Sequence, residues 1–214
     1  MINAIKYSDM SFEPQFTPLV NEAYEQAKAL LGNLPEDVDI VFTDQGASEL
    51  MGVGGFAESA DQINLCIQKG FRNRELQWRN LYGTVMHESF HLQQGFTFDK
   101  APFTALESSI YEGCAVVFER EYSESSVEYA DYSRNTDEQL QGWADEIESV
   151  GTRYFEDTET WERWAFYHPE YDQQWIIYKV GSWMVDRVLR ENQLQILDLQ
   201  NSSAQQILSG VKAL

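Results

Sequence analysis

The sequence predicts a single α+β domain that is mostly helical, with a small β-sheet in its N-terminal part. Three observations support this fold class. The chain has 214 residues, of which 43% are hydrophobic and 14% aromatic, which is enough apolar surface for one sizeable core. Short runs with the composition of strands lie before residue 70. Longer segments in which apolar residues recur at helical spacing follow them.

The N-terminal part is expected to contain one helix and three strands. The helix covers residues 17–31, with Thr17 as its N-cap and Gly32 at its C-terminal end. The strands, of which the last two form a hairpin, are expected at residues 38–43, 51–57 and 63–67. Glycines in the hairpin predict a bulge or a close approach of another part of the backbone, because no phosphate-loop lysine follows them.

Helices dominate the rest of the predicted fold. They are expected over residues 75–94, 103–122, from about 136 onward, 171–191 and 203–213. Capping boxes mark the starts of two of them, formed by Thr136 with Gln139 and by Ser203 with Gln206. A box of this kind pairs two side chains with two backbone N–H groups, so it fixes where a helix begins.

The predicted domain spans residues 1–214 and has three parts. Residues 36–118 carry the sheet and two long helices, and residues 173–214 carry the C-terminal helices. Residues 119–172 are rich in Asp and Glu and poor in Lys and Arg, but they also contain tryptophans. We therefore interpret this stretch as a folded insertion with a solvated acidic exterior rather than a tail.

The charge balance excludes some classes of function. The chain has 15 Lys and Arg against 35 Asp and Glu, a formal net charge of −20, with a pI near 4.3. Such a chain is a poor ligand for nucleic acid or for an anionic membrane surface. No secretory signal or membrane-spanning run is recognisable. Because its only cysteines, Cys66 and Cys114, are expected to be reduced, we expect a cytoplasmic protein.

The strongest chemical signal is a His-Glu-x-x-His pattern at residues 87–91, inside the helix expected over 75–94. Four residues turn an α-helix by about 400°, so His87 and His91 share one face, one turn apart. Two imidazoles at that spacing suit tetrahedral zinc. Glu88 lies about 100° round the helix, where its carboxylate can reach a metal-bound water without binding the metal. The competing interpretation is a helix with two surface histidines.

A third protein ligand is expected on the next helix, and Glu112 is the candidate. It follows His91 by 21 residues, which leaves room for a helix end at Gly95 and a short connection. Small side chains beside it, such as Ser108, would let two helices approach closely. Cys114 is a poorer ligand because it lies about 200° round the same helix. A glutamate on the helix surface is the competing interpretation.

Together these residues resemble the gluzincin metallopeptidases, and more closely the bacterial YjaZ-like group of predicted zinc-dependent proteases. The resemblance covers roughly residues 36–210. It rests on the His-Glu-x-x-His pattern, on the Glu-Gly-x-Ala run that begins at Glu112, and on a weaker match at Tyr178. It implies a zincin-like fold, a Zn²⁺ ion held by His87, His91 and Glu112, and the hydrolysis of a peptide or protein substrate.

The sequence departs from the gluzincin pattern at the residue that orients a ligand histidine. Many gluzincins place an acidic residue four positions after the glutamate ligand, and this chain has Val116 there. Glu119 lies on the same helix face as Glu112 but two turns away. The sequence therefore identifies no hydrogen-bond partner for the histidines.

The expected reaction is metal-assisted hydrolysis of an amide. Zinc lowers the pKa of a bound water towards about 7, and Glu88 would accept its proton and pass it to the leaving amine. The charge that develops on the carbonyl oxygen needs a donor, for which Tyr178 and His168 are the candidates. In the plainer interpretations, Tyr178 packs between helices and His168 is a loop residue. By analogy with the family, the edge of the hairpin pairs with an extended peptide.

Two other classes of function remain open. The chain could be a non-catalytic zinc- or peptide-binding module on a zincin-like scaffold, or a metal-free helical interaction domain with acidic surfaces. Glu88 favours the enzyme, because a purely structural zinc site does not require that carboxylate. The identity of the substrate, the choice between endo- and exopeptidase, and the oligomeric state are not encoded in any residue that we identify.

Overall fold

The computed structural model of the protein describes residues 2–7, 15–43 and 46–212. It is an α+β structure with a small N-terminal sheet, which confirms the predicted fold class. Among the described residues, no helix is both long enough and apolar enough to cross a membrane.

The chain forms two compact units. The first comprises Met1–Lys100 and Phe118–Ser126, and the second comprises Ala101–Val117 and Val127–Leu214. Helix α3 (Ala105–Tyr122) is continuous and contributes residues to both. The expected organisation as one domain with an acidic insertion stays a prediction.

A four-stranded β-sheet is the centre of the first unit, in the order β1-β2-β4-β3. Its strands are β1 (Ile2–Tyr7), β2 (Val38–Thr43), β3 (Val53–Ser59) and β4 (Gln62–Ile67). The first three in spatial order are parallel, and β3 runs antiparallel to β4. The predicted strand at 38–43 and the predicted hairpin are confirmed. Strand β1 was not predicted.

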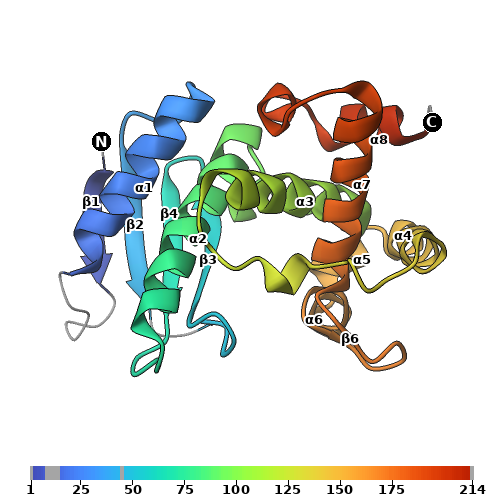
Figure 1. Ribbon diagram of the computed structural model, residues 1–214, viewed down its shortest axis with the longest axis horizontal. Helices are drawn as coiled ribbons and strands as arrows, with labels where there is room; N and C mark the ends of the chain where they lie inside the picture. The colour runs from blue at the N-terminus through green and yellow to red at the C-terminus, as the bar shows by residue number, and fades with distance from the viewer. Residues whose placement is uncertain (1, 8–14, 44–45, 213–214) are drawn as a thin grey trace. The chain divides into compact units, whose positions relative to one another are not determined.

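Helix α1 (Phe16–Leu31) and helix α2 (Arg74–Gln94) pack side by side on one face of this sheet, as Figure 1 shows. Helix α1 ends at Gly32, whose φ of 75° is a left-handed conformation that glycine adopts without strain. The prediction that Thr17 caps this helix is wrong. Gln15 occupies the N-cap position, so Thr17 already lies inside the helix.

Polar side chains of α2 anchor it to the base of the β3–β4 hairpin. The buried Gln77 amide donates from Nε2 to the carbonyl oxygens of Gly52 and Gln68, at 2.9 Å each. One turn later, Nδ2 of Asn80 donates to the carbonyl of Met51 at 3.0 Å. Buried bonds of this kind are costly to break, so they fix the position of α2 along strand β3.

The second unit is built mainly from helices. Besides most of α3 it contains α4 (Asp137–Val150), α5 (Arg153–Glu156), α6 (Thr158–Ala165), α7 (Ile176–Asn192) and α8 (Ala204–Lys212). Two short strands, β5 (Tyr167–His168) and β6 (Gln173–Gln174), pair with each other. Two short 3₁₀ turns, at Glu128–Ala130 and Ile196–Leu199, also lie in this unit, and a third, at Phe98–Lys100, lies in the first unit.

Both predicted capping boxes are present in the second unit. Thr136 and Gln139 open α4, with side-chain to backbone distances of 3.0 and 3.2 Å. Ser203 and Gln206 make the same pair of bonds before α8. The helix predicted over 171–191 starts later than expected, because strand β6 and the left-handed Trp175 (φ 53°) precede it.

Two glycines let α3 and α7 cross almost backbone to backbone. A Cβ atom on Gly181 would lie 1.8 Å from the carbonyl oxygen of Ser109, and one on Gly113 would lie 2.2 Å from the backbone of Gly181. The Ser109 hydroxyl donates to the carbonyl oxygen of Ile177 at 2.7 Å. This crossing fixes the part of α3 that carries Glu112 within the second unit.

Candidate metal centre

Helix α2 presents His87 and His91 on one face, as the spacing predicts. Both side chains are buried, and their rings meet edge to face with centroids 4.7 Å apart. Phe96, just beyond the end of α2, packs against the His91 ring at 4.9 Å. The interpretation of these histidines as surface residues is therefore wrong. Two imidazoles held side by side in a protein interior form a preorganised pair of nitrogen ligands.

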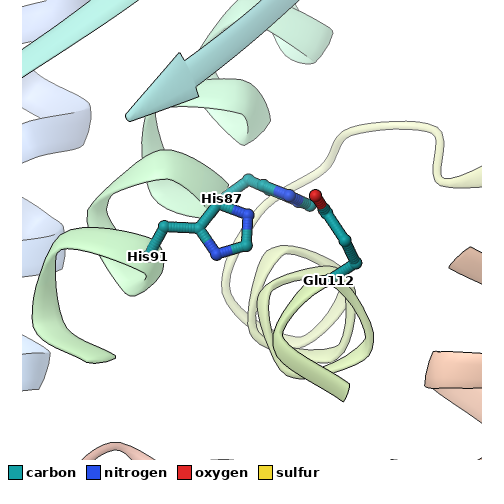
Figure 2. Close-up of side chains that lie close together, drawn as sticks. All are labelled: His87, His91 and Glu112. Carbon is teal, nitrogen blue, oxygen red and sulfur yellow. The ribbon is translucent and has the colours of Figure 1, made fainter. Parts of the chain in front are cut away.

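Glu112 completes a group with the two histidines. A ring nitrogen of each histidine and a carboxylate oxygen of Glu112 all lie within 4.8 Å of one another. Figure 2 shows the two rings extending from α2 and the Glu112 side chain extending from α3 towards them. Among the described residues, this is the one group of three or more His, Cys, Asp or Glu side chains close enough together to hold a metal ion.

The partner of His87 that the sequence did not identify is Glu119. Its Oε2 lies 3.1 Å from Nδ1 of His87, and its side chain is only 1% exposed. The Ser125 hydroxyl donates to the other carboxylate oxygen, Oε1, at 2.6 Å. Since an ionised carboxylate only accepts hydrogen bonds, it places the proton of His87 on Nδ1 and leaves Nε2 as the nitrogen that can bind a metal.

The position of Glu119 follows from helical geometry. Glu112 and Glu119 are seven residues apart on one continuous helix, so their side chains lie within about 20° of the same face. That spacing is the signal in the sequence that could have identified Glu119. What the sequence does not show is how the end of α3 packs on α2, where the ring centroids of Phe90 and Phe118 are 4.9 Å apart.

Gly83 provides the space that Glu119 occupies. A Cβ atom at this position of α2 would lie 2.3 Å from Cβ of Ser125 and 2.6 Å from Oε1 of Glu119. Nearby, Oδ1 of Asn80 accepts from the backbone N–H of Ser126 at 3.0 Å. The absence of a side chain one turn before His87 thus allows the carboxylate to reach the histidine.

Glu88 is buried directly beneath strand β3. A Cβ atom on Gly55 would lie 3.1 Å from Oε1 of Glu88 and 2.7 Å from Cγ2 of Thr84. Burial, together with the smaller effect of the negative charge of Glu88, raises the pKa of the Cys66 thiol on β4 to about 11. Glu88 is not a member of the three-residue group, and its role as a catalytic base stays a prediction.

His168 lies in the second unit, packed among aromatic side chains. It is 2% exposed, stacks on Tyr171 with centroids 4.4 Å apart, and meets the Trp164 ring at 4.6 Å. Burial lowers the pKa of His168, and the positive charge of Arg163 acts in the same direction. The histidine lines a hollow of about 330 Å³ whose other walls include Glu146. These contacts give His168 a role in packing, and its catalytic role stays a prediction.

Tyr178 lies in the first turn of α7 and is half-buried. Its ring meets that of Tyr129 edge to face, with centroids 5.4 Å apart. The structure thus gives it the packing contacts of the plainer interpretation, and its catalytic role stays a prediction.

A second tyrosine of this unit, Tyr154, was not identified as a candidate from the sequence. Burial raises its pKa well above the usual value, and the negative charge of Glu112 raises it further. Its phenol therefore stays protonated near the candidate ligand. Because α5 is a single short turn without a motif, no sequence signal points to this residue.

Comparison with known proteins identifies one family. Residues 16–209 match the model of a family described as predicted Zn-dependent protease (DUF2268), which covers nearly the whole chain. No curated protein and no solved structure shows significant similarity to it.

Proposed function

The chain belongs to the family of predicted Zn-dependent proteases, and from that premise we propose that it is a zinc peptidase of the gluzincin type, close to the YjaZ-like group. The observation that carries the proposal is the convergence of His87, His91 and Glu112, whose ligand atoms lie within 4.8 Å of one another. Two imidazoles and one carboxylate leave a fourth tetrahedral position for water or substrate, which is the donor set of catalytic rather than structural zinc sites.

The residues around this group fit a zinc ion. The imidazole of His87 is held in the required tautomer by Glu119, and Glu119 is held in turn by Ser125. Zinc bound here would lower the pKa of a coordinated water towards about 7 and polarise the substrate carbonyl. The two imidazole nitrogens favour zinc over magnesium and calcium, because those two ions prefer ligand sets made of oxygen atoms.

Glu88 is the proposed general base. It follows the first histidine on α2 and is held by strand β3, so its carboxylate is close to the group without belonging to it. In this role it accepts the proton of the attacking water and delivers it to the leaving nitrogen of the substrate. Gly55 positions this carboxylate, because any side chain on Gly55 would occupy the space of Glu88 and Thr84.

Strand β3 is the proposed docking edge for the peptide. It lies at the end of the sheet, and Gly52 before it accepts a hydrogen bond from the backbone N–H of Gln68. Along an antiparallel pair of strands, hydrogen-bonded and non-hydrogen-bonded residue pairs alternate. Phe56 lies four residues after Gly52, so its backbone N–H and C=O groups also point towards β4. The N–H and C=O groups of Gly55 and Ala57 consequently face the free edge, where an extended substrate can pair with them.

Two residues remain proposed donors to the carbonyl oxygen of the substrate. Tyr178 offers a phenol and His168 an imidazole, and removal of one such donor typically lowers kcat by 10²–10³-fold. Tyr178→Phe and His168→Gln separate this role from packing, because each variant keeps most of the side-chain volume. A loss confined to kcat would support donation, whereas a loss of stability alone would support packing.

We also propose a zincin-like arrangement of one domain, in which a sheet with a peptide-binding edge lies over the helix that carries both histidines. The packing of α2 on β3 in the first unit supports this proposal. A cytoplasmic location is proposed as well, on the support of two buried cysteine thiols, Cys66 and Cys114.

The decisive experiment combines metal analysis with hydrolysis of a mixed peptide library. We expect about one equivalent of zinc in the purified protein, loss of that zinc in His91→Ala, and cleavage products that appear with wild type but not with Glu88→Gln. Glu124→Gln is the matched control, because it removes the same charge from an exposed position. Zinc without any Glu88-dependent cleavage would favour the non-catalytic binding module, and absence of zinc would leave a metal-free interaction domain.

A further inference from the structure

Two phenylalanines are exposed beside the proposed docking edge. Phe56 of strand β3 is 40% exposed, and Phe98, in the 3₁₀ turn that follows α2, is 63% exposed. Their rings meet edge to face with centroids 6.3 Å apart. Phe98 is the most exposed of the large hydrophobic residues that the structure describes. Contiguous exposed apolar surface is a feature of ligand-binding sites, and these two rings are in contact rather than scattered singly.

The register of strand β3 relates this aromatic pair to the catalytic carboxylate. Gly55 faces α2 and lies against Glu88, while side chains along a strand alternate between the two faces. Phe56, the next residue, therefore presents its ring on the opposite face. A peptide paired with β3 would alternate in the same way, so the residue opposite Phe56 is adjacent to the residue that faces Glu88.

Resting on the proposed function, we infer that Phe56 and Phe98 form an apolar subsite. The substrates are then peptides with a large apolar side chain, aromatic or aliphatic. This side chain belongs to the peptide residue adjacent to the one that faces Glu88. The occupant is a peptide side chain rather than another protein surface, because the pair flanks the edge to which the backbone groups of Gly55 and Ala57 are directed.

The neighbouring polar groups argue against an acidic occupant. Asn64, which lies opposite Phe56 on β4, bonds to the side chains of Gln62 and Glu58 at 2.9 and 3.0 Å. Glu58 is thus engaged beside the pair. A basic side chain could still stack on an aromatic face, so the experiment includes an arginine peptide.

The test measures peptide binding independently of turnover. Short fluorescein-labelled peptides of alanine, glycine and serine carry one central phenylalanine, leucine, serine or arginine. Their binding is followed by fluorescence anisotropy to the zinc-loaded protein in the Glu88→Gln background, in which we expect no cleavage. We expect the phenylalanine and leucine peptides to bind about tenfold more tightly than the serine peptide, because partial burial of such a side chain is worth about 1.4 kcal/mol.

Variants locate the subsite. Phe98→Ser and Phe56→Ser should reduce the preference to less than about threefold, and both substitutions lie at exposed positions that leave the core intact. The control is Phe166→Ser, which removes a similarly exposed aromatic from the second unit and should leave the preference unchanged. A thermal unfolding curve for each variant verifies that it is folded.

Several results would overturn the inference: equal affinity for the apolar and serine peptides, preference for arginine, or an apolar preference that survives both phenylalanine substitutions. A change of oligomeric state in Phe98→Ser without a change in peptide preference would also do so, because the pair would then serve a second copy of the chain. Failure of the proposed function has a separate signature, in which apolar peptides bind as expected while no Glu88-dependent hydrolysis occurs.

Discussion

Glu119 offers the sharpest test of the candidate metal centre, since its role was found only in the structure. Its carboxylate is almost fully buried and lies 3.1 Å from Nδ1 of His87. Glu119→Gln keeps the size of the side chain and an acceptor oxygen but replaces a charge-assisted hydrogen bond by a neutral one. Charge-assisted bonds contribute about 1.5–3 kcal/mol and neutral ones about 0.5–1.5 kcal/mol.

The midpoints of these two ranges differ by about 1.3 kcal/mol, which corresponds to a nearly tenfold loss of zinc affinity. This loss is at the lower end of the 10–100-fold range for residues that hold a ligand histidine. Glu119→Ala should approach the upper end, because it removes the acceptor for Nδ1 of His87 altogether. Ser125→Ala should lower the zinc affinity only a few-fold, since it leaves the hydrogen bond between Glu119 and His87 in place.

The assay is a competition for zinc between the protein and a fluorescent chelator, with unfolding of the metal-free protein measured alongside it. Glu124→Gln is the control, because it removes the same charge from an exposed site of the same unit. The reasoning is refuted if Glu119→Ala binds zinc as tightly as the control does. A parallel fall in the stability of the metal-free protein would show instead that Glu119 acts on folding.

Three further predictions concern stability and reactivity. Gly181→Ala should lower the free energy of unfolding by about 3 kcal/mol, because its Cβ would overlap a backbone oxygen. Gly142→Ala, in open space on α4, should raise the free energy of unfolding by about 0.5–1 kcal/mol. Urea unfolding measures both changes. Cys66, with its pKa raised to about 11, should resist iodoacetamide at pH 8 until the protein is unfolded, as mass spectrometry would show. Because burial lowers the pKa of His168, the unfolded chain binds a proton at this histidine before the folded chain does as the pH falls below about 6.5. The free energy of unfolding should therefore decline between pH 7 and 5.5. His168→Gln should reduce that decline, as urea unfolding at the two pH values would show.

Local signals predicted much of the fold. The two capping boxes, the glycine that ends α1 and the strand at 38–43 were read from short stretches of sequence, and all are present. Each depends on residues within a few positions of one another. The wrong N-cap at Thr17 shows the limit of this approach, because Gln15 holds that position without any side-chain hydrogen bond and so leaves no signature.

Features that depend on distant segments were missed. Strand β1 pairs in parallel with β2, from which a whole helix separates it in the chain, and its short run with Asn3 and Lys6 lacks a strong strand pattern. The contact between Gly113 and Gly181 likewise joins helices far apart in sequence. Neither glycine can be distinguished in the sequence from one that merely weakens a helix.

The sequence by itself determined the histidine pair, because four residues of helix bring two side chains to one face whatever surrounds them. It also determined that Glu112 and Glu119 share a face of α3. Only the tertiary structure decided that Glu119 bonds to His87 and that Gly55 lies on Glu88. Those contacts depend on how closely helices and strands approach one another, and that distance is set by packing over the whole of the first unit rather than by any periodic pattern.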